Sequence, residues 1–310
     1  RVLVFGGELR DTHVGRMANG SDTWIYDMRD QTWERVEGAE PPPRCHIGMA
    51  VTPDGSVAFL QSGWFNAPRE EDSFIYTDTW LFEREAQAWR RLADSDPLCE
   101  ISDVQPVFDG ARGLFVFPGT GSLWTLALPD GPLEWGADMP AFLQEPGGVR
   151  GLAERPYQGF PGEAMTWYDP VREVVLRWGG YVLDGRGGRE LQKEVFAYSP
   201  ERNVMVRRAA LESGPSARVR GAVAFDTRRE RMVLFGGILG GLDDRANDLW
   251  TYDPVAHAWT ELRASNVPGP RGGYFGMAYD AELDAFSIPF GRQDRATFLD
   301  EVWRLELRPE

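Results

Sequence analysis

The sequence predicts an all-β fold built from six copies of a four-stranded unit. Two observations predict it. A tryptophan-containing segment recurs along the 310 residues, and a block of alternating apolar residues that ends in glycine precedes most of its copies. With 42% hydrophobic residues, a chain of this length can bury a large core.

The tryptophan segment accounts for half of each unit. Each clear copy carries an acid two residues before its first tryptophan and a second tryptophan nine residues after it, which indicates two strands joined by a turn. We expect the tryptophans to pack between neighbouring sheets, with ligand binding as the lesser alternative. The clear copies are SDTWIYDMRDQTWERV (21–36), TDTWLFEREAQAWRRL (77–92) and NDLWTYDPVAHAWTEL (247–262), and the weaker ones are 121–135, 193–206 and 300–307.

The apolar block supplies the other two strands. It reads GAVAFDTRRERMVLFGG at 221–237, and its short runs of β-branched and aromatic residues are typical of strands. The twin glycines Gly6-Gly7, Gly179-Gly180 and Gly236-Gly237 are expected where a strand ends and the backbone needs a positive φ. Further copies are 48–63, 163–180 and 276–291, with a degraded one at 104–119.

Six units of about 50 residues are typical of a β-propeller. We expect a single domain, 1–310, that starts in the second strand of its first blade and stops after the third strand of its last. Segment 137–160 is too short and too rich in glycine and proline for a seventh blade, so it is expected as an inter-blade loop and a candidate lid. The blades are predicted at 1–43, 44–98, 99–136, 161–213, 214–266 and 267–310.

These motifs resemble the Kelch family of propellers: a glycine pair ends the second strand, an aromatic residue and an aspartate form a turn, and a tryptophan follows at a fixed distance. The resemblance covers almost the whole chain and implies a six-bladed β-propeller of four-stranded blades. Kelch-type propellers include recognition modules, scaffolds and enzymes, so the resemblance implies no single function.

Composition excludes some partners. A net charge of −15 disfavours nucleic acid, and no apolar run approaches the roughly 20 residues of a membrane helix. The sequence starts at Arg1 without an initiator methionine, which suggests a trimmed N-terminus, and two cysteines, Cys45 and Cys99, do not indicate a compartment. We expect a soluble monomer, either cytoplasmic or secreted.

The face that carries the long loops is the predicted binding face, because binding residues concentrate on loops held by a rigid frame. Its expected loops are 8–20, 65–77, 182–192, 239–247 and 292–299. Arginine suits planar anionic groups, although pairing with acids of the same loops explains these arginines equally well. The candidate ligand contacts are Arg69, Arg186, Arg245, Arg292, Trp64, Tyr181 and Tyr157, together with Arg44, Arg218, Arg220 and Arg271 at the starts of inner strands. The Kelch resemblance implies that Arg44, Arg218 and Arg271 point into a central pocket.

Catalytic signatures are sparse. His46, His13 and Glu163 are the candidates for acid–base chemistry of the kind that the resemblance to Kelch-like sugar mutarotases implies. Cys45, His46 and Cys99 would form a reasonable metal group, but their spacing matches no local metal motif. We therefore predict neither a metal nor a cofactor.

The sequence thus predicts a propeller that binds an anionic small molecule or an acidic peptide or protein on an arginine-rich face. The alternative is a metal-independent enzyme of the mutarotase, epimerase or lyase type in a bacterial pathway.

Overall fold

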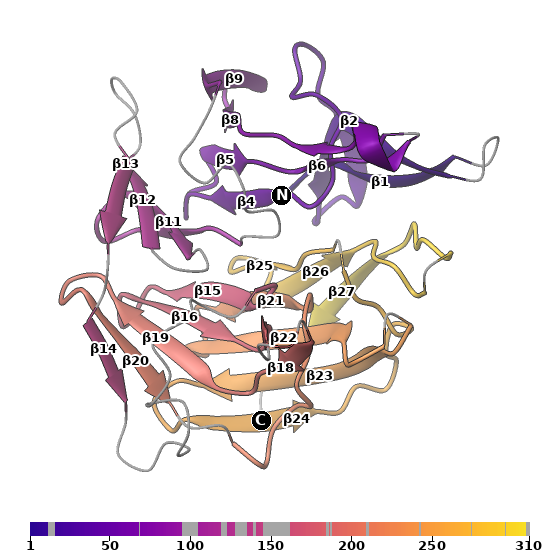
Figure 1. Cartoon of the computed structure of the whole chain (residues 1–310). Coiled ribbons are helices and arrows are strands. Elements are labelled where there is room, and N and C mark those ends of the chain that lie inside the picture. Colours follow the sequence, from indigo (N-terminus) through magenta and orange to yellow (C-terminus); the bar gives the residue numbers. More distant parts are fainter. Residues whose placement is uncertain are drawn as a thin grey trace. The chain divides into compact units, whose positions relative to one another are not determined.

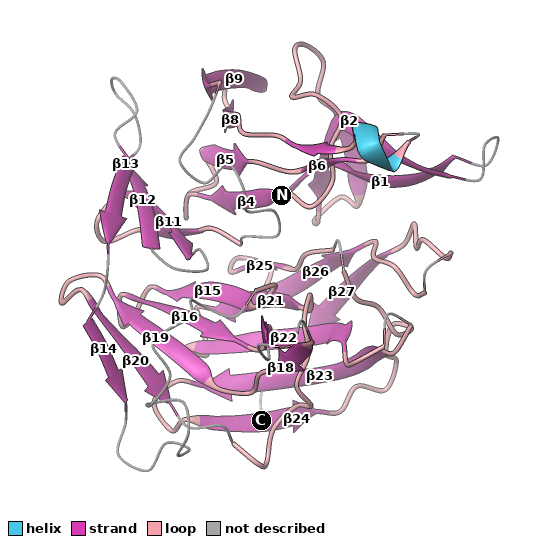
Figure 2. Cartoon of the chain, viewed as in Figure 1, coloured by secondary structure: helices cyan, strands magenta, loops and turns pink. Residues whose placement is uncertain are grey.

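The computed structural model describes residues 1–11, 16–67, 69–94, 105–118, 123–127, 135–138, 141–144, 162–183, 186, 188–208, 211–241, 243–273, 275–294 and 296–307. Within them the chain consists of strands and turns, with one short 3-10 helix, η1 (Glu70–Asp72) (Figure 2). The predicted all-β fold is confirmed. In this part of the chain no helix has the length and apolar character that a membrane crossing requires.

The chain divides into two compact units. We call residues 1–119 and 123–137 the N-terminal unit, and residues 120–122 and 138–310 the C-terminal unit. Each unit is built from small sheets (Figure 1).

The N-terminal unit has three main sheets, with strand orders β1-β2-β3, β4-β5-β8-β9 and β10-β11-β12-β13, and a two-stranded ribbon, β6-β7. The strands are β1 (Val2–Asp11), β2 (Arg16–Asp27), β3 (Thr32–Arg35), β4 (Gly48–Val51), β5 (Val57–Gln61), β6 (Trp64–Phe65), β7 (Phe74–Ile75), β8 (Thr79–Glu83), β9 (Ala88–Ala93), β10 (Val107–Asp109), β11 (Leu114–Pro118), β12 (Leu123–Ala127) and β13 (Trp135–Asp138).

The C-terminal unit also has three main sheets, with orders β14-β20-β19-β16-β15, β21-β22-β23-β24 and β25-β26-β27, and a ribbon, β17-β18. The strands are β14 (Ala141–Gln144), β15 (Met165–Asp169), β16 (Val174–Trp178), β17 (Tyr181–Leu183), β18 (Arg189–Leu191), β19 (Val195–Ser199), β20 (Val204–Arg208), β21 (Ala222–Asp226), β22 (Arg231–Ile238), β23 (Arg245–Asp253), β24 (Ala258–Leu262), β25 (Ala278–Asp280), β26 (Ala285–Pro289) and β27 (Val302–Glu306).

The predicted four-stranded unit matches these sheets strand by strand. The apolar block at 221–237 forms β21 and β22, and the tryptophan segment at 247–262 forms β23 and β24. The two outermost sheets in the sequence, β1-β2-β3 and β25-β26-β27, have three strands in the described residues, as the sequence predicts.

An aspartate at the end of a strand fixes many of the hairpin turns. The Oδ1 atom of Asp226 accepts hydrogen bonds from the backbone N–H groups of Arg228 and Arg229, at 2.9 and 3.0 Å. This side chain satisfies backbone donors that the tight turn leaves without ladder partners. The same arrangement recurs at Asp27, Asp109, Asp169, Asp253 and Asp280.

The glycine pairs adopt the left-handed conformations predicted for them. In the fifth repeat of the sequence, Gly236 has a φ of 65° and Gly237 a φ of 117°. A Cβ atom on Gly236 would lie 2.5 Å from the backbone oxygen of Arg271, so close backbone packing also requires glycine there. The ladder shifts register between Phe235 and Gly237 and then continues.

The segments predicted as long loops after the second strands contain paired strands instead. In their described residues, four of these segments are hairpins: 8–20, 65–77, 182–192 and 239–247. In the first, β1 pairs with β2 as far as Asp11 and Arg16, and in the last, β22 pairs with β23 as far as Ile238 and Arg245. The ribbons β6-β7 and β17-β18 lie in the other two. In the first and fifth repeats the glycines bend the ladder without ending it, whereas in the second and fourth repeats a separate two-stranded ribbon begins after them. A break in the apolar pattern does not reveal either arrangement.

Segment 137–160 also differs from the prediction. Residues 141–144 form β14, which adds to the edge of the next sheet by pairing parallel to β20. Residues 137 and 138 belong to β13, so an inter-blade loop was wrong for residues 137–138 and 141–144. Residues 139–140 and 145–160, including the candidate lid residue Tyr157, lie outside the described residues.

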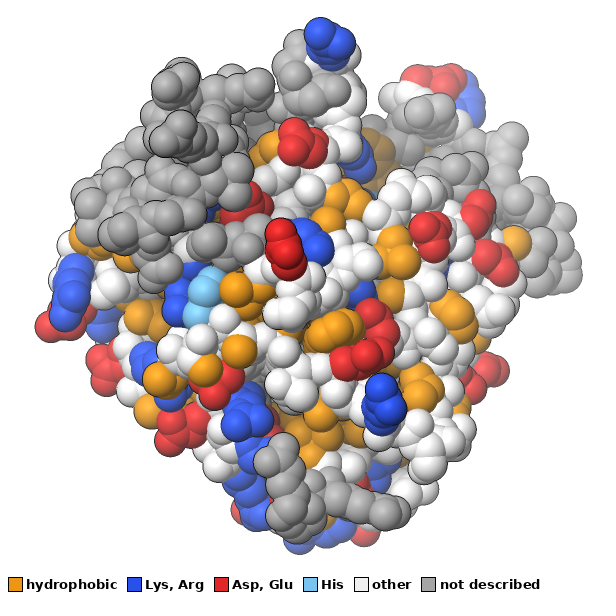
Figure 3. Space-filling model, turned by 90° about the horizontal axis from the view of Figure 1, so that it is seen from below, with side chains coloured by type: hydrophobic (Ala, Val, Ile, Leu, Met, Phe, Trp, Pro, Cys, Tyr) orange, Lys and Arg blue, Asp and Glu red, His pale blue; other side chains and the backbone are white. Residues whose placement is uncertain are grey.

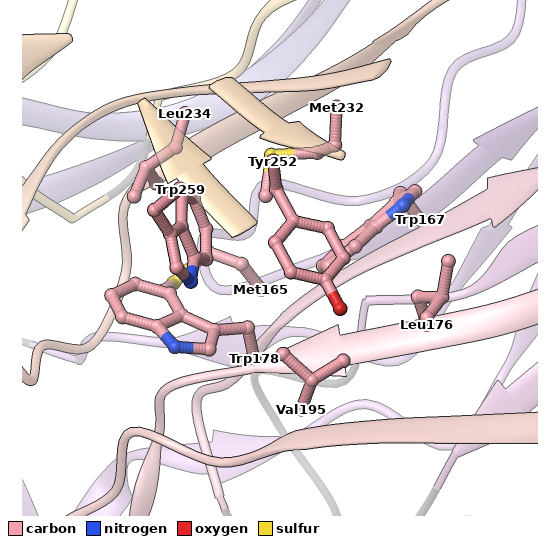
Figure 4. Packing of buried hydrophobic residues seen from close by; sticks show 9 residues of the cluster. All are labelled: Met165, Trp167, Leu176, Trp178, Val195, Met232, Leu234, Tyr252 and Trp259. Atoms are coloured by element: carbon pink, nitrogen blue, oxygen red, sulfur yellow. The ribbon is translucent and has the colours of Figure 1, made fainter. Parts of the chain in front are cut away.

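Neighbouring sheets pack face to face around the predicted tryptophans. In the C-terminal unit, the ring centroids of Trp178 from β16 and Trp259 from β24 lie 4.9 Å apart, and Tyr252 lies 5.0 Å from Trp259 (Figure 4). Trp259 is 8% exposed. The cluster consists of Met165, Trp167, Leu176, Trp178, Val195, Met232, Leu234, Tyr252 and Trp259.

The other second-position tryptophans are not uniform. Trp89 is buried, and its indole N–H donates to Thr23 of the adjacent sheet at 2.8 Å. Trp33, in contrast, is 37% exposed and contacts Trp24 and Tyr26 of its own sheet. The prediction of a core position is confirmed for Trp89 and Trp259 and is wrong for Trp33.

Replacing Trp259 with alanine should lower the free energy of unfolding by about 3–5 kcal/mol, because it leaves a cavity against Trp178 and Tyr252. Urea denaturation followed by circular dichroism measures this loss. The control is Val255→Ala in the turn before β24. Val255 is 70% exposed, so its loss should stay within about 0.5 kcal/mol. Equal effects of the two substitutions would contradict the packing described.

Candidate functional site

A tight turn leads into the first strand of several sheets, and its last residue has a left-handed backbone. These inner turns contain His46, Glu163, Arg220 and Gly273, with φ values of 54°, 54°, 54° and 71°. Glycine adopts this conformation without penalty, whereas other residues pay about 1–2 kcal/mol. Three of the four turns thus hold a charged or titratable side chain at this position, and all three of these residues are sequence candidates, so the inner turns are the candidate functional positions.

The arginine two residues earlier in three of these turns is buried. Arg44, Arg218 and Arg271 are 0%, 1% and 0% exposed. The guanidinium of Arg44 donates to both carboxylate oxygens of Asp78, at 2.5 and 3.0 Å, and to the backbone oxygens of Pro42 and Ser62. A guanidinium with these four bonds has most of its donors engaged inside the protein.

The other two arginines repeat this pattern in the C-terminal unit. Arg218 donates to Asp248 at 2.5 and 2.8 Å and to the backbone oxygen of Gly236, and Arg271 donates to Glu301 and to the backbone oxygen of Phe290. The expectation that Arg44, Arg218 and Arg271 point into an open pocket is wrong, because their side chains are buried and hold strands together. They are structural anchors.

The acid of each anchor is the one that the sequence pattern places two residues before a tryptophan. Asp78 and Asp248 also accept the indole N–H groups of Trp80 and Trp250, both at 2.7 Å. Burial by itself raises the pKa of Asp78, but the hydrogen bonds from Arg44 and Trp80 and the Arg44 charge outweigh it and hold that pKa below the ordinary value. The carboxylate is thereby kept ionised.

In the C-terminal unit the exposed edge of the inner turns is basic. The carboxylate of Glu163 pairs with Arg220 at 2.7 Å and lies 3.5 Å from Arg189. Backbone bonds join the turns: the N–H of Arg220 donates to the oxygen of Glu163, and the N–H of Gly273 donates to the oxygen of Arg220. Neighbouring repeats therefore present these side chains in one row.

Arg245 and Arg292 adjoin the same row. The Arg245 guanidinium donates to the backbone oxygens of Gly272 and Gln293, both at 3.4 Å, while the N–H of Gly272 donates to the oxygen of Arg292. The Arg245 side chain is 4% exposed, and its burial, followed by the positive charge of Arg292, lowers its pKa from the ordinary value. The Arg292 guanidinium donates to the backbone oxygen of Asp294 at 2.9 Å and lies 5.2 Å from the ring centroid of Phe298. Its charge acts on Arg245.

Tyr181 lies beside this row, because its backbone forms a two-bond bridge with Gly162 of one of its inner turns. Tyr181 follows a glycine pair, and the Arg189 guanidinium lies 4.3 Å from its ring centroid. Arg69 is well exposed beside Asp72 in the N-terminal unit, and Arg186 is exposed in a bend between β17 and β18. His13 lies outside the described residues.

In the N-terminal unit the inner turn has different chemistry. His46 lies 3.6 Å from Glu8, which follows the glycine pair of the first repeat. Cys45 forms a two-bond backbone bridge with Trp64, which places the predicted residue Trp64 directly beside this turn. Glu8 was not among the sequence candidates; its position after Gly7, equivalent to that of Trp64 after Gly63, was the signal.

Charged side chains elsewhere on the surface are mixed in sign. Acidic and basic groups are interspersed over the described part of the face in Figure 3. His257, in the turn before β24, is half-buried, and its Nδ1 atom hydrogen-bonds the hydroxyl of Tyr252 at 2.7 Å.

Comparisons with known proteins include a partial match. No family model matches the chain. It is similar to the dynein alpha chain of the flagellar outer arm of Chlamydomonas reinhardtii, with 28% identity over 124 residues. That match covers 39% of this chain and 2% of the dynein chain.

Replacing Arg44 with alanine should lower the free energy of unfolding by about 3–5 kcal/mol, because Asp78 would remain buried without its partner. The matched control is Arg90→Ala in the same sheet, whose half-exposed pair with Glu83 should contribute less than about 1 kcal/mol. Chemical denaturation of both variants measures the difference. A loss for Arg44→Ala as small as that for Arg90→Ala would contradict the anchor role.

The anchor should also weaken in acid. Since the pKa of Asp78 is lower in the folded state than its ordinary value, the pair stabilises fully above about pH 4 and loses this contribution as the pH falls through the folded-state pKa. Asp78→Asn should therefore show a smaller drop in unfolding free energy between neutral and strongly acidic pH than the native protein. Parallel drops would argue against the ion pair.

Proposed function

We propose that the chain is a six-bladed Kelch-type propeller that binds an anionic small molecule or an acidic peptide along its inner turns. Support for the architecture comes from a contact that recurs inside each unit. The N–H groups of Gly7, Gly180 and Gly237 each donate to the backbone oxygen of the residue that opens the next inner turn, at 2.9, 2.9 and 2.8 Å. The acceptors are Arg44, Arg218 and Arg271. A contact that repeats from sheet to sheet is what a circular array of blades requires.

The observation that carries the binding proposal is the pair Arg245 and Arg292. Burial is the main cause of the lowered pKa of Arg245, and the positive charge of Arg292 lowers it further. A carboxylate or phosphate placed between them would relieve the repulsion between their charges and accept charge-assisted hydrogen bonds. Arg220, joined to the same backbone row through Gly273, would add a third cation.

The acids nearby leave room for such a ligand. Asp243 lies 3.7 Å from Arg245 and is 61% exposed, so solvent screens its charge, and Asp294 is a second acid whose charge acts on Arg245. Glu163 is shared between Arg220 and Arg189. The row therefore keeps a local excess of positive charge in a protein whose net charge is −15, and this would attract an anion selectively to one place.

The enzyme alternative rests on weaker support. Glu163 would be its proton-transfer group, but its carboxylate already contacts two arginines, an arrangement that serves to position them. Binding is therefore the function that we propose.

A closed six-bladed ring of 310 residues should have a radius of gyration of about 19–20 Å, as expected for a compact domain of this length. Small-angle X-ray scattering of the monomer measures it. A clearly larger value, with a scattering curve that fits two separate bodies, would contradict the ring.

Arg292→Gln and Arg220→Gln should each weaken anion binding about 10- to 100-fold, the effect of losing one charge-assisted hydrogen bond. Isothermal titration calorimetry with phosphate, citrate and a short polyglutamate peptide tests this at low and high salt. Arg304→Gln serves as the control, since Arg304 lies on β27 and pairs with Glu306. Equal weakening by Arg304→Gln, or no binding of any probe to the native protein, would overturn the proposal.

A further inference from the structure

The inner turn of the N-terminal unit brings together three different metal-ligating side chains. Glu8 comes from β1, and Cys45 and His46 come from the turn before β4. Their donor atoms all lie within 4.8 Å of one another: the Cys45 Sγ atom is 3.9 Å from Glu8 Oε1, and His46 Nε2 is 3.6 Å from the same oxygen. Residues 37 and 38 positions apart in the sequence thus converge on one point.

We propose that Glu8, Cys45 and His46 bind a zinc ion, with a fourth coordination position open to water or to an exogenous ligand. Thiolate, imidazole and carboxylate together are a donor set suited to Zn²⁺ and unsuited to Ca²⁺ or Mg²⁺, which take oxygen ligands. Three protein ligands are the pattern of zinc sites that keep an open position.

The distances fit tetrahedral zinc. Zinc bonds of about 2.0–2.3 Å place a nitrogen and an oxygen ligand about 3.4 Å apart, and a sulfur and an oxygen ligand about 3.6 Å apart. The observed separations, 3.6 and 3.9 Å, exceed these values by a few tenths of an ångström. The third separation, between Cys45 Sγ and the His46 imidazole, is within 4.8 Å, so the ligands must draw together by side-chain rotation when zinc binds.

Surrounding groups hold two of the ligands in place. The side-chain amide of Asn66 donates to Glu8 Oε1 and to Cys45 Sγ, both at 3.4 Å. The backbone N–H of Asn66 donates in turn to the side chain of Asn19 at 2.7 Å, which fixes the position of Asn66. Partners of this kind are the usual outer shell of a metal site, because they orient its ligands.

Burial and backbone geometry point the same way. Cys45 is 1% exposed, and the side chains of Glu8 and His46 are 8% and 17% exposed. The cluster is therefore largely shielded from solvent, and solvent reaches it mainly at the His46 imidazole. His46 occupies the left-handed position that glycine fills in the last inner turn. A histidine that bears this backbone cost is consistent with a functional role for its imidazole.

Cobalt and zinc titrations test the proposal on the intact chain. The native protein should bind one Co²⁺ with a sulfur-to-cobalt charge-transfer band and tetrahedral visible bands, and Zn²⁺ should displace it and raise the melting temperature. Binding should weaken at lower pH, because the thiol must release its proton. Cys45→Ser should abolish the charge-transfer band, while Cys99→Ser should leave it unchanged.

His46→Gly is the decisive variant, because glycine suits the left-handed backbone and removes only the imidazole. It should fold at least as stably as the native protein in the absence of metal and lose at least tenfold in zinc affinity, as should Glu8→Gln. His257→Ala, in the C-terminal unit, is the matched control and should bind normally. No zinc binding at micromolar concentration, full affinity in His46→Gly, or a charge-transfer band that follows Cys99 would each overturn the site.

Discussion

The pair of a buried arginine and an acid is the interaction on which the sheets that begin with β4, β21 and β25 depend. Its arginine opens an inner strand, its acid precedes the tryptophan of the third strand, and the guanidinium also bonds the carbonyl at the end of the second strand. One side chain thus joins three strands of a sheet. The fourth sheet in the sequence lacks this arginine. Its inner turn is formed by Gly162 and Glu163, and no arginine stands two residues before Glu163. The acid of this sheet, Glu194, pairs instead with Arg207 of β20. The buried acid is retained and paired by another route, because an unpaired buried charge is costly.

This anchoring frees the next positions for function. With the strand starts held by buried arginines and the second strands ended by left-handed glycines, the inner turns have a fixed backbone whatever side chain they carry. Equivalent positions then hold very different chemistry: Glu163 and Arg220 in the C-terminal unit, and His46 in the N-terminal unit. A basic row and a cluster of carboxylate, thiol and imidazole arise from one repeated backbone, which is how a repeat scaffold acquires distinct sites without a change of fold.

The two proposed sites make different physical demands. The basic row gains from an anion through the charges of its guanidinium groups, so its affinity should fall with added salt. The cluster of Glu8, Cys45 and His46 gains from a cation through directional bonds, so its affinity depends on proton release and little on salt. Each site lies within one unit, and each can be lost without the other.

The sequence by itself determined the strand content and the repeat. Alternating apolar and polar residues, aspartate turns and glycine pairs are local signals, and their spacing is kept even where the copies of the repeat differ in sequence. It also singled out His46, Glu163 and Arg220, which the structure places at the inner turns. Only the tertiary structure decided which arginines are anchors. Arg44 and Asp78 are 34 residues apart, and neither residue type by itself indicates that its side chain will be buried. The same holds for Glu8, for the hairpins that continue past the glycine bulges, and for the parallel strand β14. These features depend on contacts between distant segments, whereas a sequence pattern reports only on neighbours along the chain.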